Sequence, residues 1–284
     1  MGDNCHAMNN SVDVLAFGEV LWDVIDGVPH IGGAPFNFAA HAARLGLSCA
    51  VISAVGNDDL GRRARSEVVR RGVSDAYLFE NALPTGTVDV TVKDGMPSYS
   101  INYPVAWDEI EIPAGCTLPS APRLVYFGTL ASRGEVSAAT LCKLLAAYPD
   151  SAVFFDVNLR QSYWSREQVL DGIANATVLK LNDEEVEMLK LRPSELFVDN
   201  LRLDIIVVTR GSEGCEVFTR GGERFASPAI GDGPVVDTVG AGDSFSAAFV
   251  AALLAGKNVH AAAEEGNRLG GRVAARAGAI PDDL

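Results

Sequence analysis

The stretch DTVGAGDSFSAAF, residues 237–249, places two aspartates around a Gly-Ala-Gly turn and then continues into an apolar segment typical of a buried helix. Glycines permit a tight turn and leave backbone N–H groups uncovered. At a helix N-terminus these groups and the helix dipole favour an anion such as phosphate. The carboxylate of Asp243 would repel such an anion unless it had a task of its own. The stretch therefore predicts either a phosphate site with a functional carboxylate or a plain glycine turn in which Asp243 caps a helix.

Composition limits the classes of protein that this chain can belong to. With 284 residues, 48% of them hydrophobic, it can bury the core of one large α/β domain, with or without a small appendage. The net charge of -14 argues against a nucleic-acid partner, because a phosphate backbone attracts basic surfaces.

Cysteine use and the N-terminal sequence bear on where the protein acts. The five cysteines are scattered without a CxxC pair, which favours reduced thiols in a cytoplasm over a disulfide framework. The N-terminal residues lack the basic start and apolar run of a secretion signal, and no apolar run approaches ~20 residues. We expect a soluble cytoplasmic protein without membrane contacts.

Strand-like and helix-like segments alternate along the chain. Short apolar runs rich in β-branched residues predict strands at 12–17, 49–55, 123–127, 152–157, 178–181 and 204–209. Helical segments are expected near 36–45, 59–71, 134–148, 165–174, 183–190, 244–256 and 259–276. This alternation predicts an α/β fold in which a mostly parallel sheet is covered by helices on both sides.

Residues 85–103 interrupt this rhythm. Val88, Val90 and Val92 alternate with polar residues, and after the turn signal at 94–95 the alternation resumes. The pattern predicts a β-hairpin with one apolar face. This hairpin could lie at the edge of the main sheet, or it could form a small β-lid that closes over a site or packs against a second subunit.

Polar residues follow most of the predicted strands. Ligands of open parallel sheets bind at the carboxyl ends of the strands. Those ends are followed by Glu19, Asp23, Gly56-Asn57, Gly128-Thr129, Asn158, Arg160, Asn182, Glu185 and Arg210-Gly211. Any one of these could be a helix cap, but together they predict a cleft for a polar ligand.

A second glycine motif narrows the choice of family. The segment GGAPFNFAAHAARLG (32–46) opens a predicted helix after a double glycine, whereas the P-loop, GxGxxG and protein-kinase signatures are missing. Together with residues 237–249 this segment resembles the two signatures of the PfkB (ribokinase-like) family of carbohydrate kinases. The resemblance runs from 16–24 to 276–281 and is strongest to the fructokinase-like branch, through DVNLRQSYW (156–164) and KLNDEE (180–185) among others.

The resemblance implies a ribokinase-like three-layer α/β fold with a small β-lid. It implies a single catalytic domain over 1–284, with the lid at about 85–103 and a contribution from about 18–36. It also implies ATP-dependent, Mg²⁺-dependent phosphorylation of a sugar hydroxyl, with D-fructose expected to become fructose 6-phosphate. We further expect a homodimer joined through the lid.

The same resemblance assigns roles to individual residues. Asp243 would be the catalytic base, and backbone amides of Gly240, Ala241, Gly242 and Asp243 would form an anion hole. Residues expected to contact the sugar are Asp23, Gly33 and Asn37, with Arg160 near both the substrate and the transferring phosphate. Residues expected on the nucleotide side are Asn182, Glu185, Thr209, Gly211, Gly214 and Asn267. Glu185 would organise Mg²⁺ through water, and Asp237 would border a site for a monovalent cation such as K⁺.

Two departures from the family pattern and three rival functions stay open. The stretch 189–204 is shorter than is usual in the family, and Arg210 stands where a smaller or aliphatic residue is common. A 2-keto-3-deoxygluconate kinase would use Arg160 to pair with a carboxylate. A nucleoside kinase fits the sugar-side segments less well. A non-catalytic sugar- or nucleotide-binding family member would be expected to have lost the base or the anion hole.

Overall fold

The computed structural model describes residues 11–93 and 96–284. In this part of the chain, nine strands form one sheet in the order β13-β12-β11-β10-β9-β8-β1-β4-β5. Their bounds are β1 Val14–Phe17, β4 Cys49–Gly56, β5 Leu78–Asn81, β8 Leu124–Gly128, β9 Ala152–Asp156, β10 Val178–Asn182, β11 Ile205–Thr209, β12 Cys215–Thr219 and β13 Arg224–Ser227. The seven strands from β11 to β5 run parallel, and the antiparallel pairings in this sheet are β11 with β12 and β12 with β13. The prediction of a mostly parallel sheet is confirmed.

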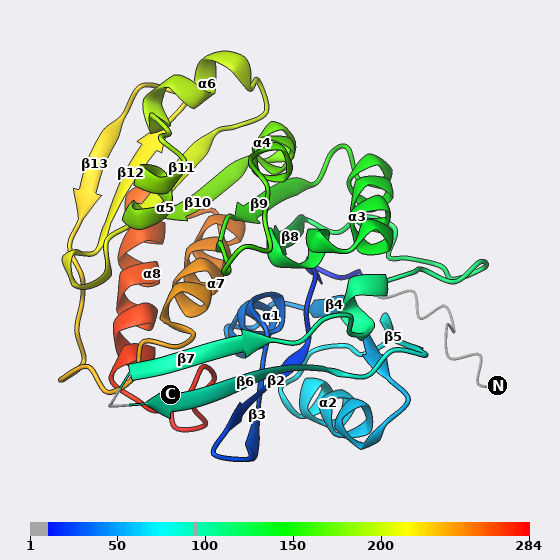
Figure 1. Ribbon diagram of the computed structural model, residues 1–284. Helices are drawn as coiled ribbons and strands as arrows, with labels where there is room; N and C mark the ends of the chain where they lie inside the picture. Colours follow the sequence, from blue (N-terminus) through cyan, green and yellow to red (C-terminus); the bar gives the residue numbers. More distant parts are fainter. Residues whose placement is uncertain (1–10, 94–95) are drawn as a thin grey trace.

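Helices cover both faces of this sheet (Figure 1). The first face carries α1 Ala34–Arg44, α2 Asp59–Arg70, α7 Ala241–Leu254 and α8 Val259–Ala274. The opposite face carries α3 Glu135–Ala147, α4 Arg166–Asn175 and α5 Asp183–Met188, with the short α6 Leu196–Asp199 beside them. In β1, Val14 and Ala16 pack on the first face, whereas Leu15 and Phe17 pack on the opposite face. Successive side chains of a strand point to opposite faces, so a strand buried on both faces must be apolar throughout.

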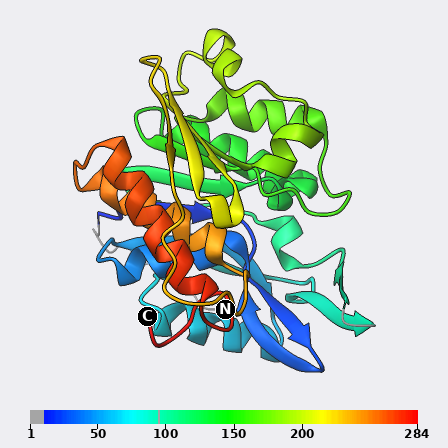
Figure 2. The ribbon, with the colours of Figure 1, turned by 90° about the vertical axis from the view of Figure 1, so that its left-hand side faces the viewer.

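The predicted hairpin belongs to a second, smaller sheet. Strands β6 Gly86–Lys93 and β7 Met96–Ile101 pair antiparallel, and the sheet order is β3-β2-β6-β7. Its other strands are β2 Leu21–Ile25 and β3 Val28–Gly32, with β2 parallel to β6. The hairpin is therefore not an edge of the main sheet, and Figure 2 shows the small sheet projecting from one side of the body. The expected turn at 94–95 lies outside the described residues.

Several details differ from the expectations. Helix α7 begins at Ala241, directly after the glycine turn, whereas the apolar pattern placed its start at residue 244. Cys49, Cys142 and Cys215 are free, but Cys116 is in a disulfide, so the expectation of reduced thiols is wrong for that residue. Among the described residues, no helix combines the length and apolar character needed to cross a membrane.

Candidate active site

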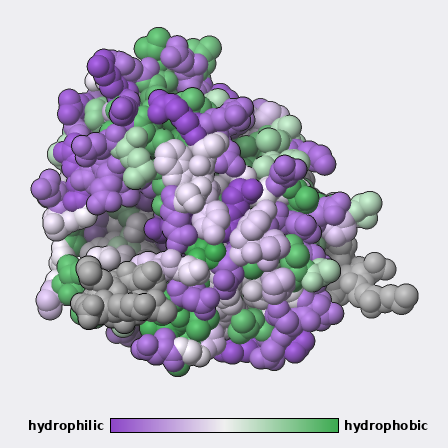
Figure 3. Space-filling view, in the orientation of Figure 1, coloured by the Kyte–Doolittle hydropathy of each residue, from purple (hydrophilic) through white to green (hydrophobic). Residues whose placement is uncertain are grey.

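A cavity of about 720 Å³ lies between the main sheet and the small sheet. Figure 3 shows the surface hollowed between the body of the molecule and the small sheet. Ten residues predicted for the site line this cavity: Asp23, Gly33, Asn37, Arg160, Asn182, Glu185, Thr209, Gly240, Gly242 and Asp243. Such a volume is typical of a small-molecule site. These residues come from positions up to 220 apart in the chain, since Asp23 and Asp243 both belong to the wall.

The glycine turn forms the N-terminus of α7. Gly240 is the N-cap residue and has a left-handed φ of 76°. A Cβ built on Gly240 would lie 2.5 Å from the carbonyl oxygen of Ala279, so glycine is needed both for the backbone angle and for the packing. The amides of the first helical turn cannot bond within the helix. The turn therefore offers donors to an anion at the cavity wall.

Asp243 and Asn37 meet across the cavity from two helices. Asn37 Nδ2 donates to Asp243 Oδ2 over 2.9 Å. Asn37 is the fourth residue of α1, and that helix begins after Gly33, whose φ is 108° and which leaves no room for a side chain beside the Glu19 carbonyl. Burial, and then the negative charge of Asp156, raise the pKa of Asp243 to about 6. A carboxylate with this pKa suits a general base near neutral pH.

Glu19, one of the strand-end residues from which a cleft was predicted, lines the cavity, although the sequence analysis gave it no role of its own. Its Oε1 accepts from the Ala34 amide over 3.1 Å, which supplies a carboxylate to the start of α1. Its Oε2 is buried without a hydrogen-bond partner among the described residues. Burial raises the pKa of Glu19 to about 7. A buried, half-satisfied carboxyl group at a cavity wall is an unusual feature, and it is consistent with a site that handles polar ligands.

Asn182 and Glu185 form a capping box at the start of α5. Asn182 Oδ1 accepts from the Glu185 amide over 2.7 Å, and Glu185 Oε2 accepts from the Asn182 amide over 2.8 Å. Glu185 Oε1 accepts from the Leu159 amide over 2.7 Å. Burial raises the pKa of Glu185. Within the described residues no group of three or more metal-ligating side chains is assembled.

The carboxylate of Glu185 is suited to contact a magnesium ion through water and not directly. Both oxygens of Glu185 already accept from amides, so its carboxylate is rigid and is suited to contact an ion through water. Mg²⁺ commonly keeps several waters and is bound by one or two carboxylates together with substrate phosphates. The residues present therefore fit an ion that arrives with a nucleotide, not a metal held by a cage of side chains.

The loop that follows β9 connects the cavity to the small sheet. Gln161 Nε2 donates to the Tyr99 carbonyl over 2.7 Å, and Tyr163 OH donates to the Ile101 carbonyl over 3.1 Å. Arg160 lies on the same loop, lines the cavity and is exposed. Its positive charge is one of the influences that lower the pKa of Asp23, although burial outweighs it and the net shift is upward. The charge of Arg160 also lowers the pKa of Asp243, so it acts both on the carboxyl group expected to contact the sugar and on the expected base.

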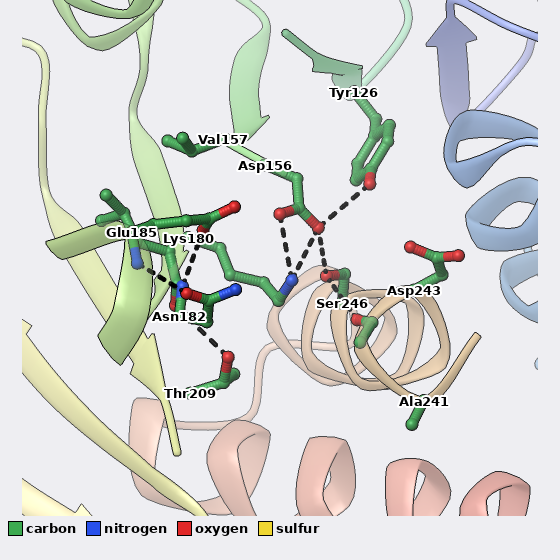
Figure 4. Close-up of polar contacts among 12 residues, drawn as sticks. Tyr126, Asp156, Val157, Lys180, Asn182, Glu185, Thr209, Ala241, Asp243 and Ser246 are labelled. Carbon is green, nitrogen blue, oxygen red and sulfur yellow. Dashed lines mark hydrogen bonds and ion pairs between the residues drawn. The ribbon is translucent and has the colours of Figure 1, made fainter. Parts of the chain in front are cut away.

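The cavity wall also includes a charged pair that the sequence analysis missed. Lys180 Nζ donates to both carboxylate oxygens of Asp156, over 3.0 and 2.8 Å. Lys180 lies in β10 and Asp156 ends β9, and the two face each other in the strand register. Figure 4 shows this pair beside the start of α7, close to Asp243. The lysine in the otherwise apolar run VLKL (178–181) was the signal, because a buried lysine needs a partner.

Five other predicted residues do not line the cavity. Asn267 donates to the carbonyl and hydroxyl of Ser227, and Gly214 packs against the Ser227 carbonyl. Gly211 begins the 3₁₀ turn Gly211–Glu213 after β11, whereas Thr209, at the end of that strand, reaches the cavity. Asp237 accepts from the amides of Val239 and Gly278, each over 3.0 Å.

Ala241 is the fifth predicted site residue that does not line the cavity. Its amide donates to the Thr238 carbonyl over 3.2 Å, so this amide is already engaged within the turn.

Comparisons with known proteins show the family and the fold. The profile of the pfkB family of carbohydrate kinases matches residues 6–284. An uncharacterized sugar kinase from Pyrococcus horikoshii is 29% identical over 267 residues, which cover 85% of this chain and 82% of that protein. Its crystal structure in complex with ATP has a TM-score of 0.80 at 26% identity and covers 94% of each chain.

Fructokinases are also similar to this chain. Fructokinase-2 of Solanum habrochaites is 26% identical over 270 residues, covering 85% of this chain and 81% of that protein. The crystal structure of fructokinase from Vibrio cholerae, with fructose, ADP and calcium ion bound, has a TM-score of 0.82 at 24% identity and covers 94% of each chain. The ribokinase-like fold expected from the sequence is confirmed by these structures.

Proposed function

The chain belongs to the pfkB family of carbohydrate kinases and is a sugar kinase, and from that premise we propose that it transfers the γ-phosphate of ATP to the 6-hydroxyl of D-fructose. The observation that carries the proposal is the 2.9 Å hydrogen bond between Asn37 and Asp243 beside the glycine turn. The bond joins Asn37, a polar side chain suited to bind a sugar, to Asp243, a carboxylate suited to act as a base. The backbone amides of the neighbouring glycine turn are suited to bind phosphate.

The proposed reaction assigns one task to each of these groups. Asp243 accepts the proton of the attacking hydroxyl while the sugar oxygen forms a bond to the γ-phosphorus and the bond to the bridging oxygen of ADP breaks. The amides at the start of α7 and the Arg160 guanidinium stabilise the charge on the phosphoryl oxygens. Asn37 and Asp23 hold the sugar so that its hydroxyl lies close to Asp243.

The charges on the cavity wall favour a neutral sugar over a sugar acid. Among the described residues that line the cavity, five carboxyl groups outnumber the two cations, Arg160 and Lys180. Arg160 already interacts with the charge of Asp23, and a carboxylate substrate would have to compete with that side chain. These charges support fructose over 2-keto-3-deoxygluconate.

Two ions belong to the proposal. Magnesium bound to the nucleotide phosphates would be held through water by Glu185 and would offset phosphate charge. We also propose a monovalent-cation site near Asp237 and the carbonyls around Ala279. In support, a double mutant of the Vibrio cholerae fructokinase was solved with potassium ion bound.

A coupled assay of ADP release with fructose, ribose, 2-keto-3-deoxygluconate and adenosine tests the proposal. The expected result is the highest kcat/KM with fructose. A kcat/KM for 2-keto-3-deoxygluconate well above that for fructose would overturn the substrate assignment, and Arg160 would then be reassigned to a carboxylate, for which its planar fork is suited. Binding of sugar and nucleotide without turnover of any of them would indicate a non-catalytic family member.

Activity should fall on the acid side near pH 6. The base works only when deprotonated, and the environment of Asp243 raises its pKa from 3.8 to about 6, so the active form is lost as pH falls through about 6. We expect kcat/KM for fructose to drop about tenfold per pH unit below that value. The measurement is kcat/KM from pH 5 to pH 8, with samples returned from pH 5 to pH 7.5 as the control for irreversible unfolding. A profile that stays flat down to pH 5 would contradict a raised pKa at the base.

We propose that the small sheet is a lid and that a second copy of the chain covers its outer end. Val88 and Val90 are buried within one chain, so the part of the face next to the cavity needs no partner. The same face continues to Ile25, Val28 and Tyr99, which stand in one row with Val90 across the four strands, and of these three Tyr99 also lines the cavity. These three side chains are 39%, 54% and 50% exposed. An apolar row of this kind on a projecting sheet favours a homodimer.

Light scattering should therefore give twice the chain mass of 30.0 kDa at micromolar concentration. Val28→Asp is expected to yield monomers, because it places a charge in the proposed interface. Val198→Asp is the matched control, since Val198 is 76% exposed and lies on α6, far along the chain from the small sheet. A wild-type protein that is monomeric and fully active would count against the dimer. The small sheet could then still act as a lid, because closure over the sugar needs no second chain.

A further inference from the structure

Helix α1 binds the expected base and the C-terminal part of the chain through one face. Asn37 and His41 are four residues apart, so they lie one above the other on the same side of the helix. Asn37 Nδ2 donates to Asp243 Oδ2 over 2.9 Å. His41 Nε2 lies 2.8 Å from the carbonyl oxygen of Ala279. The helix that presents Asn37 to the cavity thus also holds the segment around Ala279.

The imidazole of His41 is a neutral donor with a fixed tautomer. A carbonyl oxygen can only accept a hydrogen bond, so Nε2 carries the proton and donates to Ala279. His41 is 1% exposed, and burial lowers its pKa to about 4, so the ring is uncharged at neutral pH. Its Nδ1 is buried without a hydrogen-bond partner among the described residues. An apolar side chain would avoid the cost of burying Nδ1, so the bond to Ala279 is what this imidazole contributes.

Ala279 in turn packs directly on the glycine turn. A Cβ built on Gly240 would lie 2.5 Å from the carbonyl oxygen of Ala279 and 2.6 Å from its Cα. The carbonyl group that His41 binds is therefore the one that lies against Gly240. Asp237 Oδ2 also accepts from the Gly278 amide over 3.0 Å. The segment 278–279 is thus held by α1 on one side and by the loop before α7 on the other.

From these contacts we infer that His41 is a positioning residue for phosphoryl transfer, which holds the glycine turn in place through the backbone of Ala279. The inference rests on the proposed function. Asn37 and His41 are about one helical turn apart, so one rigid element supports both the sugar side of the site and the amides at the start of α7. His41 does not line the cavity, and it neither touches the substrates nor transfers a proton.

The inference is tested first with His41→Leu, which removes the donor and leaves an apolar side chain of similar size. With fructose, kcat is expected to fall by about 10–10²-fold, because a small misplacement of the groups around the reacting atoms can cost this much. The KM for fructose should stay nearly unchanged, since Asn37 and Asp23 are intact. His41→Gln is expected to restore most of kcat, because its side-chain amide can donate to Ala279 as the imidazole does.

Two further variants complete the set. His41→Met also lacks a donor, and its flexible side chain fits irregular spaces, so it takes the place of His41→Leu if that variant does not fold. His260→Leu is the matched control, because the imidazole of His260 is half exposed and lies 2.7 Å from a carboxylate oxygen of Glu223 at the surface. The control should keep the kcat of the wild-type protein.

Nucleotide binding gives a readout that a merely structural role would not move. The probes are ADP and the β,γ-imido analogue of ATP, each with magnesium, measured by calorimetry at pH 7.5. In a folded variant without the donor, a displaced glycine turn should lower the affinity for the analogue about tenfold relative to ADP, as expected when a hydrogen bond to a charged group is lost.

Equal changes in affinity for ADP and for the analogue would overturn the inference. So would a folded variant without the donor that keeps more than about a third of wild-type kcat, or a His41→Gln protein as slow as His41→Leu. The failure of the inference and that of the proposed function are distinguishable. If the wild-type protein phosphorylates none of the sugars, the proposed function fails, whereas the comparison of the two nucleotides still decides whether His41 supports the phosphate site.

Discussion

Replacing Asp243 by asparagine is expected to lower kcat by about 10²–10⁴-fold while binding of ATP stays nearly unchanged, because only the proton acceptor is lost. Asparagine keeps the size of the side chain and the backbone amide of residue 243. Its carbonyl oxygen can still accept from Asn37 Nδ2, as the Asp243 carboxylate does over 2.9 Å. The measurement is kcat with fructose, together with calorimetric binding of the β,γ-imido analogue of ATP.

The alternative role of Asp243 as a helix cap predicts a different outcome. Asparagine caps helices about as well as aspartate, so activity and stability would barely change. In the structure the N-cap of α7 is Gly240, and no side chain caps that helix. Asp59→Asn is the matched control, since Asp59 is an exposed carboxylate in the first turn of α2. A variant that keeps more than about a tenth of wild-type kcat would show that Asp243 is not the base.

Gly240→Ala is expected to damage both the fold and the phosphate site. The added Cβ would lie 2.5 Å from the Ala279 carbonyl oxygen at a residue whose φ is 76°. Strain in the left-handed conformation and overlap with the backbone together should lower the free energy of unfolding by about 2–4 kcal/mol. The first turn of α7 must shift to relieve the overlap, and kcat should fall by about 10²–10³-fold as its amides leave their positions.

Gly256→Ala separates the two contributions to this effect. Gly256 has a φ of 80°, and a Cβ there meets nothing within 4 Å. It should therefore show only the cost of the left-handed backbone, about 1–2 kcal/mol, with kcat unchanged. Urea unfolding and steady-state kinetics of both variants measure the difference. Equal losses of stability and equal kcat in the two variants would mean that the contact between Gly240 and Ala279 has no role in the site.

Most of the fold could be predicted because the parallel strands are buried on both faces. Runs such as 49–55 and 204–209 are apolar throughout, and their positions agree with β4 and β11. The strands that were missed are those with one polar or open face. VPHIG in β3 contains a proline and a histidine, and RFAS in β13 is a short edge strand. Neither segment therefore shows a clear alternation of apolar and polar residues. Partner choice across the small sheet, where β2 pairs with β6, depends on tertiary contacts that sequence patterns do not reveal.

The site was predictable where residues belong to local motifs and unpredictable where they depend on distant partners. Asp243, Asn37 and Glu185 follow glycine turns or caps, and the structure places each of them at the cavity. Lys180 lies inside one apolar strand and Asp156 ends another. The two side chains come together as an ion pair only when β9 and β10 pair. Asn267 was assigned to the nucleotide side through the resemblance, but its amide bonds to Ser227, 40 residues away in the chain.

The central claim is that phosphate moves from ATP to the 6-hydroxyl of fructose at Asp243. Phosphorus NMR of the purified protein with MgATP and fructose tests it most directly, because the spectrum separates a sugar phosphate from inorganic phosphate. We predict a phosphate ester at C6 of fructose that appears in step with ADP, and its absence with the Asp243→Asn protein. Formation of ADP with inorganic phosphate alone, or no consumption of ATP in the presence of fructose, would contradict the claim.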